Sequence, residues 1–476
     1  MMFTTYSYFG FLLIAFLVHW SLPVAWRKAF LVGASYFFYC TWRWEFGFLL
    51  LGVSLFNWAY GRWVLARCAR GWTLVLGIAA NSLPLVYFKY TGFLVTNLAG
   101  AVNLLGGHWH PMVPTVLLPL GISFFTFQGI AYLVDIATGE KPLERLLDFL
   151  LFKALWPQLI AGPIVRLGDI RNSIEGERRL GYDDFSEGSR RVLLGLVKKV
   201  VLADSLAATV DRVFVSNSTP NTIECLTGVL GFGMQIYFDF SAYSDLAIGS
   251  ARLFGFRLPE NFNWPYLAPS PREFWNRWHM TLSSWIRDYL FTPLVFATRN
   301  KPMLQPVWLL GAMAVCGLWH GAAWTFVIWG IWHGLLLLLN QTVLSRVFPK
   351  TSSPGVSASV WPRVAGMVLT FVLVHVGWVF FRAPSVHHAL GILHHLIVPC
   401  GGLRPTFLRE NDVLLVGVLF VGFVLAHVWQ AFAARECSGP RSRAWIRWVR
   451  PLAYASMIVA AIVFDKEATA FVYFQF

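Results

Sequence analysis

The sequence predicts an all-α, polytopic membrane protein, and two observations lead to this class. The chain of 476 residues is 57% hydrophobic and only 13% charged, with a mean hydropathy of +0.58, whereas a soluble domain carries about 25% charged residues. A helix needs about 20 apolar residues to cross a bilayer, and the recurrence of apolar stretches therefore predicts roughly ten to twelve crossings, with re-entrant or amphipathic helices between them. These uncharged or nearly uncharged stretches lie at about residues 8–25, 29–42, 46–61, 72–88, 91–107, 111–134, 146–165, 192–210, 222–250, 307–340, 364–381, 412–434 and 452–464.

The charged residues predict the orientation of the chain. The formal net charge is +14, and basic loops of membrane proteins remain in the cytoplasm. The alternation of basic clusters after the first three stretches places the N-terminus outside and the long polar segment Arg166 to Lys199 in the cytoplasm. This segment could also attract the phosphate groups of an acidic donor such as coenzyme A. Nucleic-acid binding is not expected, and the first stretch predicts a retained span because no Lys or Arg precedes it.

The chain shows no sign of a second domain or of a metal site. We find no internal repeat and no long linker, and the Pro349 to Gly355 patch is typical of a loop between spans. Residues 1–476 are therefore predicted to form one membrane domain. The cysteines show no metal-ligand spacing and are interpreted as packed side chains without disulfides. Cys316 lies one helical turn before His320, so a thiol nucleophile paired with this histidine is the alternative.

A histidine stands near the middle of the longest uncharged stretch. Between Val307 and Asn340 there is no Asp, Glu, Lys or Arg, and His320 lies in the sequence Gly317 to Trp324. An ionisable group at membrane depth is a candidate for a functional site. We interpret His320 as a catalytic candidate.

A second histidine lies on a tryptophan-rich segment, residues 271–290. Wound as one helix, this segment carries an aromatic stripe that includes Trp278 and Trp285 on one side and charged residues on the other. Such a helix lies at a membrane interface or lines a polar cavity. His279 falls at the edge of the apolar arc, where it either faces a site or packs.

Together, the two histidines indicate acyl transfer. An imidazole has an ordinary pKa of ~6.5, so it can accept a proton from a hydroxyl and return it to a leaving group. Metal binding is less consistent with the sequence, since no Asp, Glu or Cys joins His279 or His320 at ligand spacing.

Several ordered motifs resemble the membrane-bound O-acyltransferase superfamily, and most closely its bacterial branch, the integral-membrane proteins of alginate O-acetylation. The two signature regions are Trp278-His279 with the residues that follow, and Leu318-Trp319-His320-Gly321. The resemblance extends through residues 119–128, 157–166, 237–249, 259–263, 378–383 and the C-terminal 473–476.

This resemblance implies a helical membrane fold with a central tunnel in the inner membrane of a bacterium. It implies that His320 is the principal catalytic base and that His279 is a second catalytic residue that positions or assists. The donor would be acetyl-coenzyme A, which enters from the cytoplasm as a substrate, and no bound cofactor is expected. The acceptor would enter from the other side. A periplasmic partner of SGNH type, together with the glycan-synthesis machinery, would complete transfer to an extracytoplasmic polysaccharide.

Further polar or aromatic side chains are candidates for substrate binding. Their alternative role is to satisfy helix ends or each other. They are Asp239, Ser241, Tyr243, Asp245, Gln158, Arg166, Asn276, Arg277 and Trp319.

Three alternatives remain open at this point. The first is a teichoic-acid type of transferase that takes a D-alanyl group from a carrier protein. The second is a transporter whose intramembrane histidines relay protons. The third concerns the small residues Gly317, Gly321 and Ala322, which either leave room for a short acyl chain beside His320 or let helices pack closely.

Overall fold

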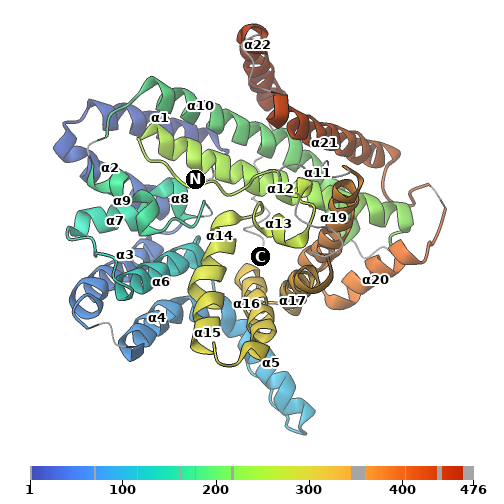
Figure 1. Cartoon of the computed structure of the whole chain (residues 1–476), viewed down its shortest axis with the longest axis horizontal. Coiled ribbons are helices and arrows are strands. Elements are labelled where there is room, and N and C mark those ends of the chain that lie inside the picture. Colours follow the sequence, from blue (N-terminus) through green and yellow to red (C-terminus); the bar gives the residue numbers. More distant parts are fainter. Residues whose placement is uncertain are drawn as a thin grey trace. The chain divides into compact units, whose positions relative to one another are not determined.

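The computed structural model describes residues 3–68, 71–114, 116–160, 162–176, 178–215, 219–344, 360–402, 404–436 and 442–464, with the side chains of 360 and 431–450 excepted. Within these ranges the secondary structure consists of helices and contains no strand (Figure 1). The all-α prediction is therefore confirmed. The C-terminal motif Tyr473 to Phe476 and the loop Pro349 to Gly355 lie outside the described residues.

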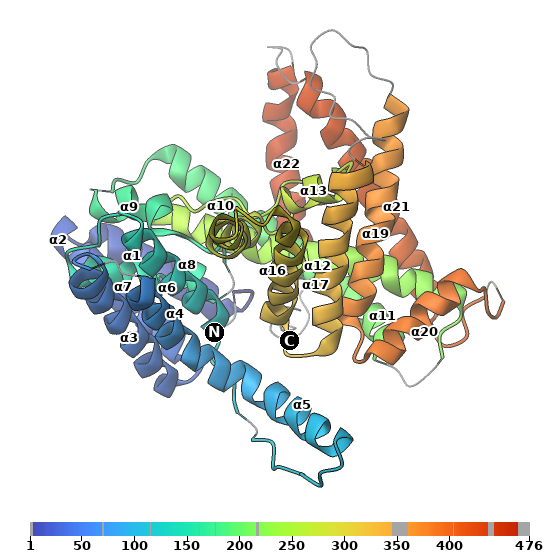
Figure 2. The same ribbon diagram turned by 60° about the horizontal axis from the view of Figure 1, so that its bottom comes forward.

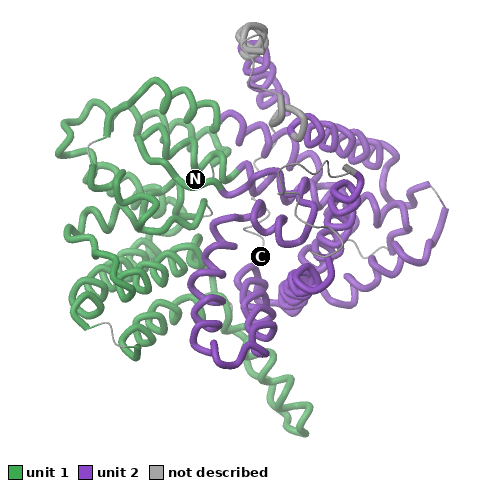
Figure 3. The backbone as a smooth tube through the Cα atoms, viewed as in Figure 1, with its two compact units in different colours: residues 1–192, 243–260 green, residues 193–242, 261–476 purple. Residues whose placement is uncertain are grey.

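The chain forms two compact units, which Figure 3 distinguishes by colour. Unit 1 contains residues 1–192 and 243–260, and unit 2 contains residues 193–242 and 261–476. Two helices, α10 (Tyr182–Val197) and α12 (Thr222–Leu253), contribute residues to both units. The single membrane domain stays a prediction.

Unit 1 is built from helices that pack both on neighbours in sequence, such as α2 on α3, and on helices farther along the chain, such as α2 on α7 and α4 on α6. The first helix begins after Thr5, whose hydroxyl caps it by accepting from the Tyr8 N–H. In Figure 2, α5 extends away from the other helices of this unit. Besides its parts of α10 and α12, unit 1 contains α1 (Tyr6–Ser21), α2 (Val24–Cys40), α3 (Trp44–Ala59), η1 (Tyr60–Leu65), α4 (Gly71–Leu85), η2 (Val86–Tyr90), α5 (Thr91–Leu104), α6 (Ile122–Ala137), α7 (Leu146–Ala154), α8 (Trp156–Leu159) and α9 (Leu167–Glu175).

Unit 2 combines long helices with a series of short ones. The short helices begin after a break that follows α12. The elements are η3 (Lys198–Ala203), α11 (Asp204–Phe214), η4 (Pro265–Leu267), α13 (Pro271–Trp275), α14 (Met280–Trp285), η5 (Ile286–Phe291), α15 (Thr292–Ala297), η6 (Pro302–Leu304), α16 (Gln305–His320), α17 (Trp324–Leu339), η7 (Asn340–Leu344), α19 (Val360–Arg382), α20 (Val386–Ile397), α21 (Glu410–Glu436) and α22 (Ser442–Val463).

Six helical segments among the described residues are long and apolar enough to cross a membrane. Three shorter apolar helices, Tyr6–Ser21, Ile122–Ala137 and Pro451–Val463, accompany them. The polytopic class is confirmed, while the larger number of crossings stays a prediction. The six segments are Trp44–Leu65, Gly71–Leu104, Pro302–His320, Trp324–Leu344, Trp361–Arg382 and Glu410–Gln430.

The uncharged stretch 307–340 bends back on itself. It forms the antiparallel pair α16 and α17, which lie side by side in Figure 2. Glycine makes this approach possible from both helices. A Cβ on Gly317 would overlap the Phe326 carbonyl, and one on Gly330 would overlap the Met313 carbonyl. Small residues at such contacts are how membrane helices pack closely.

Candidate active site

The first predicted catalytic residue, His320, is the last residue of α16. The next residue, Gly321, has an extended backbone, and α17 begins at Trp324. His320, near the middle of the uncharged stretch in the sequence, therefore stands at the end of a helix in the structure. A Cβ on Gly321 would overlap the Phe326 ring, so the tight turn between the two helices requires glycine at this point.

The second residue, His279, lies at a break that the sequence did not predict. The expected single helix over 271–290 is wrong, because α13 ends at Trp275 and α14 begins at Met280. His279 has a φ of 41°, in the left-handed region, and residues other than glycine rarely adopt this backbone conformation. Backbone hydrogen bonds to a preceding loop replace a continuous helix at this point. The Asn263 N–H donates to the Arg277 carbonyl at 2.9 Å, and the Met280 N–H donates to the Asn261 backbone carbonyl at 3.0 Å.

The two histidines pack against the same tryptophan. The ring centroid of Trp319 lies 5.8 Å from that of His279 and 4.9 Å from that of His320. His279 is 0% exposed and His320 is 6% exposed. Within unit 2, Trp319 thus contacts two imidazoles whose residues lie 41 positions apart in the sequence. Their joint role in acyl transfer stays a prediction.

The surroundings of both imidazoles are aromatic. His279 contacts the ring of Phe240 on α12 at 4.6 Å. His320 contacts Trp329 of α17 at 4.9 Å and Phe381 of α19 at 5.1 Å between ring centroids. His279 lies outside the six candidate spans, and burial lowers its pKa to about 3. Its imidazole is therefore neutral above that pH, which is the form that accepts a proton.

A cavity is lined by residues of the segments that carry the two histidines, although neither imidazole is among its lining residues. It has a volume of about 420 Å³, within the range of ~300–1,000 Å³ that is usual for small-molecule sites. Met280, which follows His279, lines it, and so does Cys316, one turn before His320. Two exposed arginines, Arg272 and Arg287, also line it, and the Arg287 guanidinium forms an ion pair with Asp288 at 2.7 Å. The other wall consists of apolar residues of α16, including Ala312 and Met313.

Comparison with known proteins decides the family. Residues 144–376 match the model of the membrane-bound O-acyltransferase family. A relative named probable alginate O-acetylase AlgI, from Azotobacter vinelandii, is 41% identical over 76% of this chain and 71% of its own length. The chain belongs to the membrane-bound O-acyltransferase family. It is thus an enzyme, and the transporter alternative is wrong.

The chain is also similar to transferases whose names give other acceptors. The peptidoglycan O-acetyltransferase of Helicobacter pylori is 34% identical over 82% of this chain and 78% of its own length. The teichoic acid D-alanyltransferase of Bacillus subtilis is 28% identical over 67% of this chain and 80% of its own length. The region that matches the family model contains His279, Trp319 and His320.

Several of the candidates for substrate binding in this O-acyltransferase lie in unit 2. Asn276 lines the cavity, while the Arg277 guanidinium next to it donates to Glu273 at 2.9 Å. Asp239, buried in α12, forms an ion pair with Lys199 at 2.7 Å. The hydroxyl of Ser241 donates to the carbonyl of Phe238 within its own helix, at 3.5 Å.

The ion pair of Asp239 with Lys199 is joined by a third charged residue. Lys199 also contacts Asp204 at 2.8 Å, and Lys199 itself is 1% exposed. Burial acts to lower the pKa of Lys199, but the two carboxylates outweigh it and raise the pKa above its ordinary value. The geometry of Asp239 therefore agrees with the alternative interpretation, in which these groups satisfy each other.

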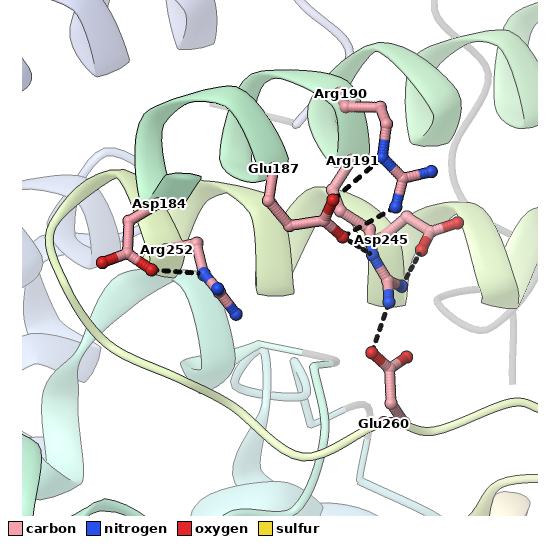
Figure 4. Close-up of polar contacts among 7 residues, drawn as sticks. All are labelled: Asp184, Glu187, Arg190, Arg191, Asp245, Arg252 and Glu260. Atoms are coloured by element: carbon pink, nitrogen blue, oxygen red, sulfur yellow. Dashed lines mark hydrogen bonds and ion pairs between the residues drawn. The ribbon is translucent and has the colours of Figure 1, made fainter. Parts of the chain in front are cut away.

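The other candidates for substrate binding, apart from Trp319, belong to unit 1. Asp245 accepts from Arg191 at 2.6 Å, and the same guanidinium also contacts Glu260 and Glu187 (Figure 4). The Gln158 amide donates to the Phe152 carbonyl at 2.6 Å.

Two further candidates complete unit 1. Arg166 precedes the first turn of α9, where its backbone N–H donates to Asp169 at 2.9 Å. The ring of Tyr243 packs against Phe3, with 4.8 Å between ring centroids. The roles of these residues in substrate binding stay predictions.

The sequence interpretation missed two residues that the structure brings to these groups. Asn261 contacts His279, and Lys199 contacts Asp239. A charged residue in an otherwise apolar helix requires a partner, so Asp239 was a signal that a cation would lie nearby. Asn261 had no such signal beyond its place in the motif 259–263.

Proposed function

We propose that this O-acyltransferase takes an acetyl group from acetyl-coenzyme A and passes it on for the O-acetylation of an extracytoplasmic polysaccharide. The observation that carries the proposal is the packing of His279 and His320 on one Trp319 ring, with Met280 and Cys316 from the same segments lining a cavity of about 420 Å³. The similarity to proteins named as O-acetylases supports acetyl as the group that is transferred.

The chemistry assigned to the histidines is general base catalysis. His320 takes the proton of the acceptor hydroxyl while the oxygen attacks the thioester carbonyl carbon. The carbon–sulfur bond breaks, and the thiolate receives the proton back from the imidazolium, which leaves an acetyl ester and a thiol. His279 holds the acceptor hydroxyl by accepting a hydrogen bond from it. Such proton transfer contributes roughly 10²- to 10⁴-fold to a rate.

The cavity is assigned to the donor. Its apolar wall suits the slender arm of a coenzyme A thioester. Arg272, exposed at the lining, would attract the phosphate groups of the coenzyme, and Arg287 would do so in exchange for its partner Asp288. In this arrangement the part of the cavity that Arg272 lines would face the cytoplasm, where the donor is made.

The acceptor side requires partners. We place the enzyme in the inner membrane of a bacterium, where a periplasmic protein of SGNH type receives the acetyl group and the glycan-synthesis machinery supplies the polysaccharide. The D-alanyl alternative is kept as an outcome of the test below.

The test uses purified full-length protein in lipid nanodiscs with labelled acetyl-coenzyme A. We expect release of the coenzyme A thiol, with loss of this activity in His320→Ala. A matched control is His427→Ala, which removes another buried imidazole of unit 2 from a helix, α21, that does not line the cavity. An intact acetyl thioester, together with consumption of a D-alanylated carrier protein, would overturn the acetyl assignment.

A further inference from the structure

We propose that Asn261 is a positioning residue that fixes the tautomer of His279 and thereby places the basic lone pair on Nε2. The proposal rests on the proposed function, because a defined lone pair matters only if His279 takes part in transfer. It is carried by three contacts that converge on one side-chain oxygen of Asn261.

The first step identifies the atom of Asn261 that faces these groups. An amide side chain presents either a carbonyl oxygen, which accepts, or an NH₂ group, which donates. The backbone N–H of Thr281 lies 3.3 Å from this atom and can only donate. The Thr281 hydroxyl lies 2.9 Å from it. The atom is therefore the carbonyl oxygen Oδ1, since an NH₂ group would set two donors against each other.

The second step follows from the first. The Nδ1 atom of His279 lies 3.1 Å from the same Oδ1. An oxygen that only accepts requires a donor, so Nδ1 carries the proton. In a neutral imidazole the other nitrogen is then the base. Nε2 is consequently the atom that receives a proton or accepts a hydrogen bond from a substrate hydroxyl.

The third step concerns the backbone. His279 is held in the left-handed region, with a φ of 41°, and a strained residue persists only where its surroundings over-determine it. Asn261 fixes both the backbone and the side chain at this position. Its backbone carbonyl accepts from the Met280 N–H at 3.0 Å, and its side-chain oxygen accepts from the His279 imidazole. Asn261 and His279 are each 0% exposed. Water does not replace these bonds without rearrangement of the protein.

A purely structural role for Asn261 makes different predictions. Thr281 lies in the first turn of α14, where backbone N–H groups have no partner within the helix. Asn261 would then act only as a cap for this helix, and His279 would be a bystander. The two roles differ in whether the imidazole changes its protonation pattern when Asn261 is replaced.

The first experiment reads the tautomer directly. Full-length protein with ¹⁵N-labelled histidine is examined by NMR in nanodiscs, and the His279 signals are assigned as those lost in His279→Gln. We expect a protonated Nδ1 and an unprotonated Nε2 in the wild type and in Asn261→Asp, which keeps the acceptor. Asn261→Leu should populate the other tautomer. A wild-type His279 with its proton on Nε2 overturns the proposal, whether or not the protein transfers acetyl groups.

The second experiment reads the effect on transfer. Asn261→Leu should lower kcat by about 10²-fold or more with little change in KM, because the accepting lone pair on His279 Nε2 is lost while the donor site remains. Asn261→Asp should restore much of kcat. Thr281→Val is the matched control, since it removes a partner of the same oxygen and leaves the His279 contact in place. If Asn261→Leu and Thr281→Val lower kcat and melting temperature in the same proportion, Asn261 is only a cap.

Asn261→Asp adds a pH readout that a cap would not produce. The rings around His279 belong to Phe240 of α12, to Phe262 of the loop that carries Asn261, and to Trp319 of α16. None of these three carries charge. A carboxylate beside Nδ1 favours the imidazolium, so the pKa of His279 rises and the acidic limb of the kcat profile moves to higher pH. An unchanged limb in an active Asn261→Asp enzyme contradicts the proposal. A wild-type enzyme that releases no coenzyme A defeats the proposed function and leaves the tautomer result standing.

Discussion

His279 and His320 reach the same Trp319 ring by different structural means. His320 ends a regular helix that is fixed by close glycine contacts to α17. His279 lies between two short helices with its backbone in the left-handed region, held by Asn261 from a separate loop. The difference teaches that one catalytic candidate depends on helix packing and the other on a local hydrogen-bond network. Substitutions should separate these two dependences.

The largest effect is expected from the histidine at the helix end. His320→Ala should remove roughly 10²- to 10⁴-fold in transfer rate, the usual contribution of a general base. The helix should remain intact because alanine favours helices. Release of coenzyme A and the melting temperature of purified protein are the two measurements. Transfer at the wild-type rate would refute the role of His320.

His279 should respond in two separable ways. His279→Ala and His279→Gly both remove the imidazole and should lower transfer strongly. Glycine adopts a positive φ without strain, so His279→Gly should be more stable than His279→Ala by about 1 kcal/mol. Chemical or thermal unfolding compares the two variants. Full activity in either one would reduce His279 to a packing residue.

Substitution in the glycine contact tests the packing side of the comparison. Gly321→Leu would drive a side chain into the Phe326 ring. We expect stability and transfer to fall together, with a loss of about 1–3 kcal/mol for overpacking. Gly311→Leu is the matched control, because nothing lies within 4 Å of the Cβ that it would add. A stable but inactive Gly321→Leu protein would instead support the alternative in which this glycine leaves room for the acyl chain.

The smallest effect on activity is expected from a probe of orientation. Ser186 is exposed on α10, within the segment that the basic residues assign to the cytoplasm. Ser186→Cys should retain transfer and resist an impermeant thiol reagent in intact spheroplasts, after which lysis exposes it. The native cysteines provide the background to be subtracted. Labelling of intact spheroplasts would reverse the orientation and with it the side from which the donor enters.

The sequence predicts the parts of this protein that follow regular patterns. Apolar stretches locate the long helices, and the uncharged run around His320 identifies a candidate that packs on the same Trp319 ring as His279. The broken segment 271–290 could not be predicted in this way, because its aromatic periodicity fits one helix. The break depends on backbone pairing with Asn261 and Asn263, which lie in a loop that precedes the segment. Helical periodicity carries no information on such contacts.

Asp239 shows the same limit from another direction. Its position in an apolar helix singles it out from sequence, and its partner, Lys199, lies forty positions earlier on η3. Residues that far apart on separate elements meet only through tertiary packing. Asp239→Asn would leave the buried ammonium with one carboxylate partner fewer, and breaking a buried pair in this way typically costs about 3–5 kcal/mol.

The close glycine contacts between α16 and α17 give the cavity two walls of unequal stiffness. Helices that touch along their backbones behave as one rigid hairpin, since a packed interface resists deformation. The facing wall contains α13, α14 and the π-helical turn η5, which are short and separated by breaks. We therefore expect a ligand that widens the cavity to displace the short helices more than the hairpin, whose first helix ends at His320.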